Sequence, residues 1–258
     1  MRHRLVACPV CDTVYASPAP AASALAGAYE EAAFDSGEEA SFAAATYARL
    51  VRRLLPRLPA EGGALDVGTG DGAFLSELTA LGFGDVAGVE PSTAPIAAAR
   101  PEVRDLIRHG VFDPADFEPG RFRLITAFQT LEHVTDPLEL CRAARELLLP
   151  GGALLVVCHD RRALVNRVMG LRSPINDVEH LQLFSRRSLT ELLERSGLRP
   201  VGLTPVVNRY PLRYWLRLAP LPARARWVTA ADLVRLGAVP VRLRVGNLAA
   251  VGFSPAPR

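Results

Sequence analysis

The stretch GALDVGTGDGAF, residues 63–74, places an aspartate near the end of a short apolar run and follows it with three glycines on alternate positions. The run ALDV (64–67) has the length of a buried strand, and helix-forming residues begin at Ala73. Glycine tolerates positive φ and lets a ligand approach the main chain. The stretch therefore predicts a strand, a ligand-binding turn and a helix.

Strand-like and helix-like segments alternate after this unit. Strands are predicted at 85–90, 106–108, 122–128 and 153–158, and helices at 73–81, 93–100, 137–149 and 185–197, with a further helix at 38–58 before the first strand. This alternation favours an α/β fold, a doubly wound and mostly parallel sheet with right-handed crossovers. Residues 159–184 and 208–246 do not fit the alternation and are interpreted as insertions.

Composition is that of an ordinary globular α/β protein. The chain has 258 residues, of which 49% are hydrophobic and 22% charged, enough for one medium domain with decoration. Its longest apolar runs fall well short of the roughly 20 residues of a membrane-spanning helix. The start, MRHRLVACPV, has too short an apolar stretch for a signal peptide, so we expect a cytoplasmic protein.

The positive charge is unevenly distributed. All 30 cationic residues are arginine, and ten of them lie from Arg199 onward against one acid, Asp232. In RYPLRYWLRLAP (209–220) the arginines fall four residues apart, at Arg209, Arg213 and Arg217, which predicts a basic stripe on a helix. A lid over an anionic substrate, a solvated helix and a membrane-surface contact through 209–226 all remain open. Without a recognisable recognition module, no nucleic-acid partner is expected.

The four cysteines fall into two groups. Cys141 and Cys158 lie in a predicted helix and a predicted strand and are interpreted as buried hydrophobic residues. Cys8 and Cys11 form CPVC, half of a zinc site, but tetrahedral zinc needs four ligands and only His3 is near in sequence. We therefore expect no bound metal.

Two carboxylates indicate which ligand the glycine turn binds. The glycine pattern at 68–73 also fits a dinucleotide, and Glu90 lies where an acid accepts hydrogen bonds from ribose hydroxyls. Asp66, however, would repel a pyrophosphate and attract a cation. S-adenosylmethionine carries an ammonium and a sulfonium and no phosphate, so it suits this turn better than NAD.

Five blocks resemble the class I S-adenosylmethionine-dependent methyltransferases, in the branch typified by ubiquinone-biosynthesis-like O-methyltransferases. They are LDVGTGDG (65–72), GVEPS (88–92), TLEHVTDP (130–137), LPGGALLVV (149–157) and EHLQLFSRRSLTELLERSGL (179–198). The resemblance covers about residues 60–200. The segment CPVCDTVYASPAP (8–20) is similar to the second half of a zinc ribbon that precedes some members, and the first CxxC has no counterpart here.

The resemblance implies a Rossmann-like methyltransferase fold with an N-terminal helix and a C-terminal insertion. Residues 1–36 would form an N-terminal extension with a connector over 12–36, and residues 37–258 the methyltransferase domain with its cofactor-binding core at 60–200. The implied cofactor is S-adenosyl-L-methionine. The residues predicted to bind it are Asp66, Gly68, Gly70, Gly72, Glu90, Pro91, Asp113, Gln129 and Thr130.

The sequence departs from the family pattern at two points. Arg123 stands where the family usually has an acid. Val111 and Phe112 follow the third strand in place of an acidic adenine ligand, which leaves Asp113 as a displaced candidate.

Histidines at the carboxyl ends of the strands are the candidates for a general base, since histidine is the commonest one near neutral pH. We rank His133, after the fourth strand, above His180; His159 directly follows the fifth strand. Each also suits a structural role. Glu132 is expected to hydrogen-bond backbone in its loop.

The predicted function is methyl transfer to a small-molecule acceptor, with O-methylation favoured. One alternative is an NAD-dependent oxidoreductase, for which residues 200–258 are too short and irregular to form a substrate domain. The other is a catalytically silent domain that binds cofactor or a protein partner, an interpretation that Arg123 and the truncated CPVC segment favour. The acceptor and the oligomeric state do not follow from the sequence.

Overall fold

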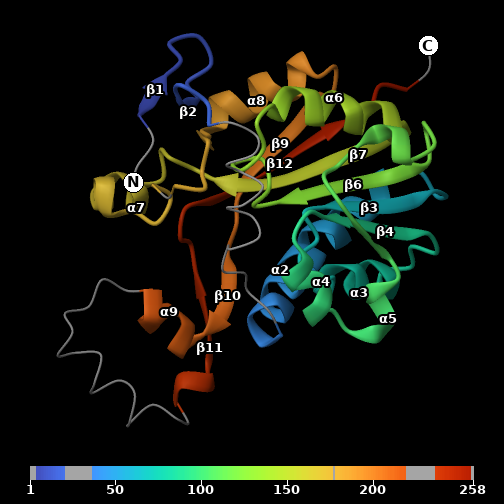
Figure 1. Ribbon diagram of the computed structural model, residues 1–258, viewed down its shortest axis with the longest axis horizontal. Coiled ribbons are helices and arrows are strands. Elements are labelled where there is room, and N and C mark those ends of the chain that lie inside the picture. The colour runs from blue at the N-terminus through green and yellow to red at the C-terminus, as the bar shows by residue number, and fades with distance from the viewer. Residues whose placement is uncertain (1–3, 21–36, 177, 219–235, 257–258) are drawn as a thin grey trace.

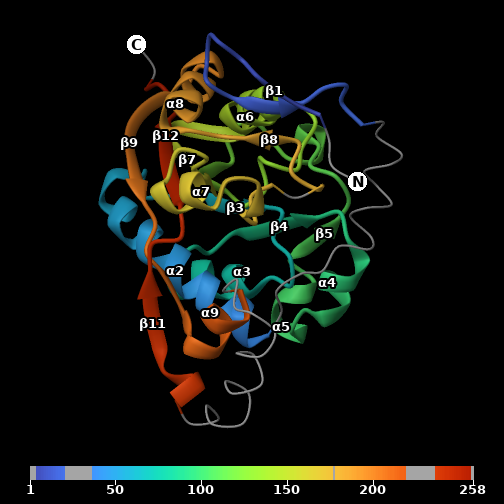
Figure 2. The ribbon, with the colours of Figure 1, turned by 90° about the vertical axis from the view of Figure 1, so that its left-hand side faces the viewer.

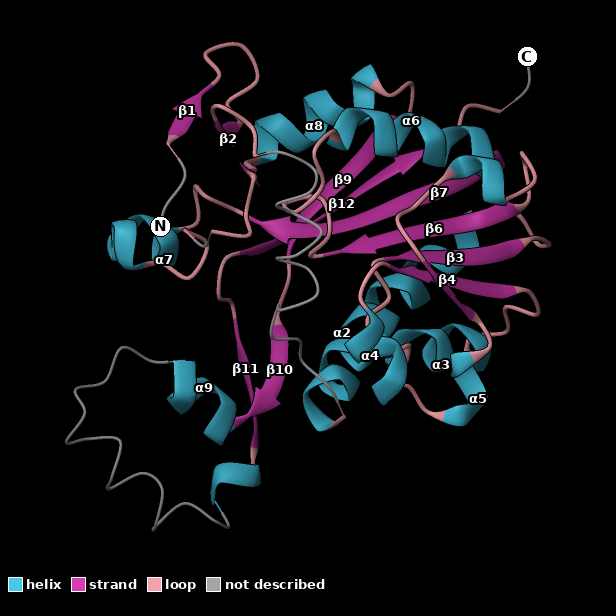
Figure 3. Cartoon of the chain, viewed as in Figure 1, coloured by secondary structure: helices cyan, strands magenta, loops and turns pink. Residues whose placement is uncertain are grey.

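The computed structural model describes residues 4–20, 37–176, 178–218 and 236–256 (Figure 1). A seven-stranded sheet with helices on both faces forms its centre (Figure 3). In sheet order the strands are β5 (Ile107–His109), β4 (Val86–Glu90), β3 (Gly63–Val67), β6 (Phe122–Phe128), β7 (Leu148–His159), β12 (Asn247–Phe253) and β9 (Arg199–Pro205). The first five run parallel, and β12 is antiparallel to both of its neighbours. The predicted doubly wound, mostly parallel sheet is confirmed.

Helices cover both faces of the sheet, which is why its central strands are almost continuously apolar. Helices α2 (Glu38–Leu54) and α3 (Ala73–Ala80) pack on one face, and α6 (Pro137–Leu147) and α8 (Arg186–Arg195) on the other (Figure 2). The predicted helix at 93–100 ends earlier, as α4 (Thr93–Ala98), and a short α5 (Pro101–Arg104) follows it. Single 3₁₀ turns lie at Leu55–Arg57, Pro114–Asp116, Gly170–Arg172 and Leu236–Ala238.

Strands β9 and β12 are the main elements that the sequence did not predict. Strand β9, RPVGLTP, contains two prolines and a glycine, a composition tolerated because it pairs on one side only. Strand β12, NLAAVGF, is buried between β7 and β9, and its alanines and glycine carry little hydrophobic signal. The sheet therefore extends beyond the predicted core at 60–200.

The N-terminal segment forms a hairpin that joins the domain. Strands β1 (Leu5–Ala7) and β2 (Val14–Ala16) pair with each other, and β2 pairs with β8 (Gln182–Leu183). Residues 14–16, predicted as part of a connector, are thus a strand, while 21–36 lie outside the described residues. The backbone N–H of Ala16 also donates to Leu181 O at 2.8 Å.

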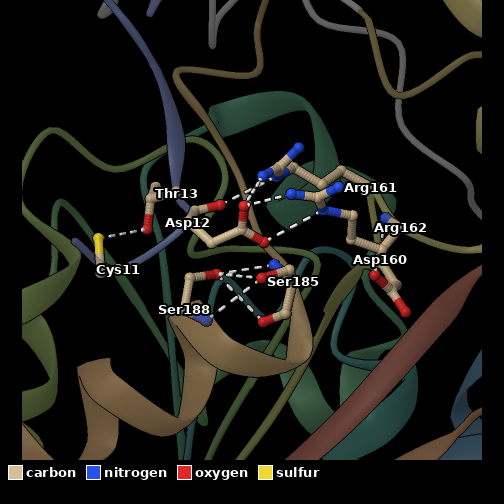
Figure 4. Close-up of polar contacts among 8 residues, drawn as sticks. All are labelled: Cys11, Asp12, Thr13, Asp160, Arg161, Arg162, Ser185 and Ser188. Carbon is tan, nitrogen blue, oxygen red and sulfur yellow. Dashed lines mark hydrogen bonds and ion pairs between the residues drawn. The ribbon is translucent and has the colours of Figure 1, made fainter. Parts of the chain in front are cut away.

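Asp12, in the hairpin turn, clamps the segment that follows β7 (Figure 4). Its carboxylate pairs with both Arg161 and Arg162, with 2.6 Å between Arg162 Nη2 and Asp12 Oδ1. Arg161 Nε also donates to the Asp12 carbonyl at 2.9 Å. The hydrogen bond from Arg162 lowers the pKa of Asp12 to about 2, so the clamp stays charged across the physiological range. Beyond this segment lies the short helix α7 (Leu164–Met169).

The C-terminal insertion forms an arm made of β10 (Asn208–Pro211), α9 (Leu212–Leu218) and β11 (Pro240–Leu243). The predicted helical stripe of Arg209, Arg213 and Arg217 is wrong. Arg209 lies on β10, opposite Arg242, because Tyr210 is buried and Pro211 ends the strand before the helix begins. Arg213 is on α9 and pairs with Glu38 of α2; residues 219–226 lie outside the described part of the chain.

Arg123, which stands where the family usually has an acid, has a structural role. Its Nη1 donates to the carbonyls of Pro59 and Ala60, at 3.1 and 2.7 Å, and its guanidinium lies 4.2 Å from the centroid of the Phe83 ring. The Arg123 side chain therefore fixes the turn that leads into β3. Because this role is structural, an arginine at this position is no argument against a cofactor site.

Replacing Arg123 with methionine should destabilise the protein. Arg123→Met keeps the aliphatic stem but removes charged donors from two carbonyls, which costs about 2 kcal/mol of unfolding free energy. Urea denaturation measures this change. The control is Arg187→Met, at an exposed arginine on α8, and equal stability of the two variants would contradict the role given to Arg123.

Neutralising Asp12 should release the hairpin from the domain. In Asp12→Asn the amide retains one oxygen but loses the charge that pairs with two arginines, so we expect faster hydrogen exchange at the Ala16 amide, measured by mass spectrometry. Glu118→Gln, at an exposed acid, serves as control. Unchanged protection of Ala16 in the Asp12 variant would mean that β-pairing alone holds the hairpin.

Within the described residues, no helix combines the length and the hydrophobicity needed to cross a membrane.

Candidate cofactor and acceptor site

The glycine turn lies at the carboxyl edge of the sheet, between β3 and α3. Gly68, Gly70 and Gly72 all have positive φ, at 76°, 58° and 71°. A Cβ on Gly68 would lie 2.6 Å from Thr130 Oγ1, so this glycine permits close packing against the end of β6. A Cβ on Gly70 would meet nothing within 4 Å. The open face of the turn is therefore over Gly70.

Glu90, the last residue of β4, holds the glycine turn in place. It is buried; its Oε2 accepts from the Gly70 N–H at 2.8 Å and its Oε1 from the Ser92 N–H at 2.9 Å. A carboxylate has about four acceptor positions, so each oxygen retains capacity for a ligand hydroxyl. The ribose-binding role of Glu90 stays a prediction.

Asp66 lies on β3, beneath the turn, and is only 3% exposed. Thr126 Oγ1, on the neighbouring strand β6, donates to Asp66 Oδ1 at 2.6 Å. Burial raises the pKa of Asp66 to about 7, and the Glu90 charge adds to the increase, while the Thr126 hydrogen bond opposes it. Burial therefore favours the neutral carboxyl, whereas a nearby cation would favour the carboxylate.

Gln129 and Thr130 follow directly after β6. Thr130 Oγ1 donates to Val67 O at 2.9 Å and ties this loop to the end of β3. Gln129 has a positive φ of 55°, and its backbone N–H donates to Val157 O at 2.7 Å. Its side-chain Nε2 is buried and has no acceptor among the described residues. A ligand or a water molecule can supply the missing acceptor.

These residues fit S-adenosylmethionine. A buried carboxylate suits a cation, the open face over Gly70 leaves room beside the main chain, and the Gln129 amide suits a carboxylate such as that of the methionine moiety. Equilibrium binding data would test each of these roles separately.

Pro91 and Asp113, the remaining predicted cofactor residues, bind other parts of the protein. The Pro91 carbonyl lies 3.1 Å from Nε2 of His109. Asp113 is exposed and its Oδ1 accepts from the Ala115 N–H at 2.9 Å, which caps the 3₁₀ turn at 114–116. The predicted roles of Pro91 and Asp113 in cofactor binding stay predictions.

Three histidines meet beside the ends of β6 and β7. His133 lies in the loop after β6, His159 is the last residue of β7, and His180 precedes β8. The His180 ring centroid lies 4.8 Å from that of His133 and 5.2 Å from that of His159. The structure therefore brings together His133 and His180, the two predicted candidates for a general base. It adds His159, whose position directly after a predicted strand marks it as a further candidate.

Hydrogen bonds orient each of these imidazoles. Nδ1 of His133 lies 3.1 Å from Glu179 O, and Nδ1 of His180 lies 2.9 Å from Ile175 O. A carbonyl only accepts, so Nδ1 carries the proton in both rings, and Nε2 is the basic nitrogen of each neutral imidazole. Nδ1 of His159 lies 2.9 Å from Oδ1 of Asn247, on β12.

His159 is set apart from the other two histidines by its environment. The surrounding protein desolvates its ring, and the neighbouring His180 and His133 add positive charge, which together lower its pKa to about 4. His159 is therefore neutral throughout the physiological range. Asn247, which orients it, lies on a strand that the sequence did not predict.

Glu132 connects the histidines through backbone. Its Oε1 accepts from the His159 N–H at 2.7 Å, and its carbonyl accepts from the Leu181 N–H at 2.7 Å. The expected backbone role of Glu132 is confirmed. Because Leu181 in turn bonds Ala16, the hairpin clamped by Asp12 supports the segment that carries His180.

The four cysteines lie in two environments. Cys141 and Cys158 are buried, as predicted. Cys8 and Cys11 lie in the turn between β1 and β2, where backbone amides of Cys11 and Val10 lower the pKa of the Cys8 thiol. In the part of the chain that the structure describes, no group of three histidine, cysteine or acidic residues has the arrangement of a metal site. The expected absence of metal stays a prediction.

Comparison with known proteins identifies the class. The family model described as "Methyltransferase domain" matches residues 40–203. A solved structure of geranyl diphosphate C-methyltransferase from Streptomyces coelicolor, in complex with Mg²⁺, geranyl diphosphate and S-adenosyl-L-homocysteine, has 17% sequence identity and a TM-score of 0.52 over 81% of this chain and 77% of its own. At that identity the likeness shows the fold alone.

Two curated relatives carry the same name, ubiquinone biosynthesis O-methyltransferase. The Marinobacter nauticus protein is 35% identical over 169 residues, which are 58% of this chain and 71% of the relative. The Pseudomonas paraeruginosa protein is 36% identical over 103 residues, or 38% of this chain. In that second match the chain spans only 44% of the relative's length.

The fold, the glycine turn with its two acids and the family match define a class I methyltransferase domain. The chain belongs to the methyltransferase domain family, whose methyl donor is S-adenosylmethionine. The predicted family and cofactor class are confirmed. Individual site residues stay predictions.

The burial of Asp66 should leave a signature in the pH dependence of stability. Its pKa is about 7 in the folded chain against 3.8 as the ordinary value, so the folded state binds the proton more tightly and this group lowers the free energy of unfolding as pH rises between those values. Asp66→Asn removes the effect. Urea denaturation at about pH 5 and about pH 8 should show a smaller loss of stability in the variant than in the wild type; equal losses would contradict the raised pKa.

Proposed function

We propose that the protein transfers a methyl group from S-adenosylmethionine to a small-molecule acceptor, with oxygen as the favoured methylated atom. The observation that carries this proposal is a buried acid, Asp66, on the strand that leads into a glycine turn with open space at Gly70. The family match and the O-methyltransferase relatives support it.

On the cofactor side, the chain's residues would bind and orient the donor. Asp66 would supply the charge that a cationic ligand needs, Glu90 would accept from ribose hydroxyls, and Gln129 Nε2 would donate to the carboxylate. When bound, the cofactor supplies an electrophilic methyl group on a positively charged sulfur. The transfer is an in-line displacement, so most of the rate comes from alignment of the two reactants.

On the acceptor side, His133 is the proposed general base. Its Nδ1 proton is held by the Glu179 carbonyl, so Nε2 is the nitrogen that would take a proton from an acceptor hydroxyl. His180, whose ring is adjacent, is the second candidate. We assign His159 to positioning, because its lowered pKa makes it a weak base.

For the acceptor, we propose a chemical class and not a particular compound. The relatives' name supports a hydroxyl-bearing acceptor, but the first matched relative is covered over less than half of its length. The anionic-acceptor or membrane contact of the 209–226 segment stays a proposal, and within that segment Arg213 pairs with Glu38. A cytoplasmic location likewise stays a proposal.

Donor binding provides the first test. Asp66→Asn should bind S-adenosylhomocysteine or S-adenosylmethionine about tenfold more weakly or worse, since it loses a charge interaction worth at least about 1.4 kcal/mol. Wild-type affinity for S-adenosylmethionine should rise with pH up to about pH 7, as the carboxyl ionises, and the variant should show no such rise. Calorimetric titration measures both. Asp105→Asn, at an exposed acid, is the control; unchanged affinity in Asp66→Asn would refute the cofactor assignment.

Methyl transfer provides the second test. Incubation with labelled S-adenosylmethionine and a metabolite extract should label an acceptor, and His133→Gln should lower kcat by about 10²-fold, the usual contribution of a general base. Donor affinity should not change in that variant. A wild-type protein that binds the donor and labels nothing would support the catalytically silent alternative.

A further inference from the structure

Five arginines from three elements gather on the surface between α2 and the arm. Arg49, Arg52 and Arg53 lie near the end of α2, Arg209 lies on β10 and Arg242 on β11. We call this set the arginine cluster. Figures 1 and 2 both show α2 beside the β10–β11 pair.

Backbone register and ring packing bring these arginines together. Arg209 and Arg242 are directly opposite in the antiparallel pair β10–β11. Helix α2 packs against β10 through Phe42 and Tyr210, whose ring centroids are 6.4 Å apart. Arg49 lies seven residues, or two helical turns, beyond Phe42 on the same side of α2, and the charges of Arg242 and Arg209 act on its guanidinium.

The cluster is electrostatically unbalanced. Among the described residues, none of its five members takes part in an ion pair, and the nearby acid Glu38 is paired with Arg213. Arg49 donates to the Thr46 hydroxyl at 2.9 Å, a neutral partner. The pKa of Arg49 is lowered, first by burial and then by the charges of Arg242, Arg209, Arg52 and Arg53.

An arrangement of this kind opposes the stability of the fold. Like charges directly opposite each other in a sheet are destabilising, and here the charges of the cross-strand pair also act on a third, half-buried guanidinium, that of Arg49. An anion with several negative charges would remove the repulsion. Guanidinium groups match phosphate oxygens in particular, because they form two parallel hydrogen bonds to one phosphate.

We propose that the arginine cluster is a binding site for a phosphate-bearing ligand, such as a diphosphate ester or the phosphate headgroups of lipids. The site is separate from the methyl-transfer residues, and its occupancy does not depend on the proposed function. It also replaces the helical stripe expected from sequence, since only Arg209 belongs to both sets.

Inorganic pyrophosphate is the probe for the site. Calorimetric titration of the full chain should show binding that weakens about tenfold or more in the double variant Arg209→Gln/Arg242→Gln, because charge-assisted hydrogen bonds from two guanidiniums are lost. The matched control, Arg199→Gln, removes one exposed arginine on β9 and should bind like the wild type. Equal weakening in both variants would indicate a nonspecific charge effect and overturn the proposal.

Thermal unfolding gives an independent readout. Without any anion, the double variant should melt at a higher temperature than the wild type, because the cross-strand repulsion is gone; with pyrophosphate, the wild type should gain more than the variant. A double variant that melts lower than the wild type without anion would contradict the repulsion on which the proposal depends. S-adenosylhomocysteine binding should be equal in both proteins, so a failure here is distinct from a failure of the methyltransferase assignment.

Vesicle sedimentation separates the two sources of phosphate. Binding to phosphatidylglycerol vesicles but not to phosphatidylcholine vesicles, lost in the double variant, would identify lipid headgroups. Pyrophosphate binding without sedimentation would identify a soluble phosphate ester. Binding of neither probe, or binding of RNA alone, would overturn the proposal.

Discussion

The carboxyl of Asp66, buried between β3 and β6 and held by the Thr126 hydroxyl, is the constraint on which the site depends. An isolated buried carboxylate is unfavourable, and its raised pKa expresses that cost. A cation above the turn would offset it. Glu90 adds a second acid, which fixes the turn through the Gly70 amide. Of the two acids, Glu90 is thus the one that holds the turn in shape.

The proposed acceptor side is assembled from parts of the chain that are far apart in sequence. His133, His159 and His180 come from three different segments, and Glu132 joins them through backbone hydrogen bonds. Strand β8 continues this network to the N-terminal hairpin. Function depends on the site and not on the fold alone, and the family match shows the class of methyl donor without showing the acceptor.

Sequence reasoning predicted the sheet, the glycine turn and the neighbourhood of His133 and His180, because strong patterns mark each of them. It missed β9 and β12, since prolines, alanines and glycines dilute the apolar signal, and with β12 it missed Asn247. It placed Arg209 on a helix because a four-residue spacing of arginines suits a helix. In the structure Tyr210 is buried, and Arg209 lies on strand β10. The contact of Asp12 with Arg161 and Arg162 joins residues about 150 positions apart, and no local pattern encodes such a contact.

The pairing of β2 with β8 constrains the order in which the fold can form during synthesis. Strands β1 and β2 are synthesised before β8, the strand at residues 182–183 with which β2 pairs. In the folded chain the side chain of Ala16 is buried with that of Leu181, so Ala16 lacks this packing partner until Leu181 has been synthesised. The hairpin can therefore pair with the domain only after the five parallel strands of the central sheet have been synthesised.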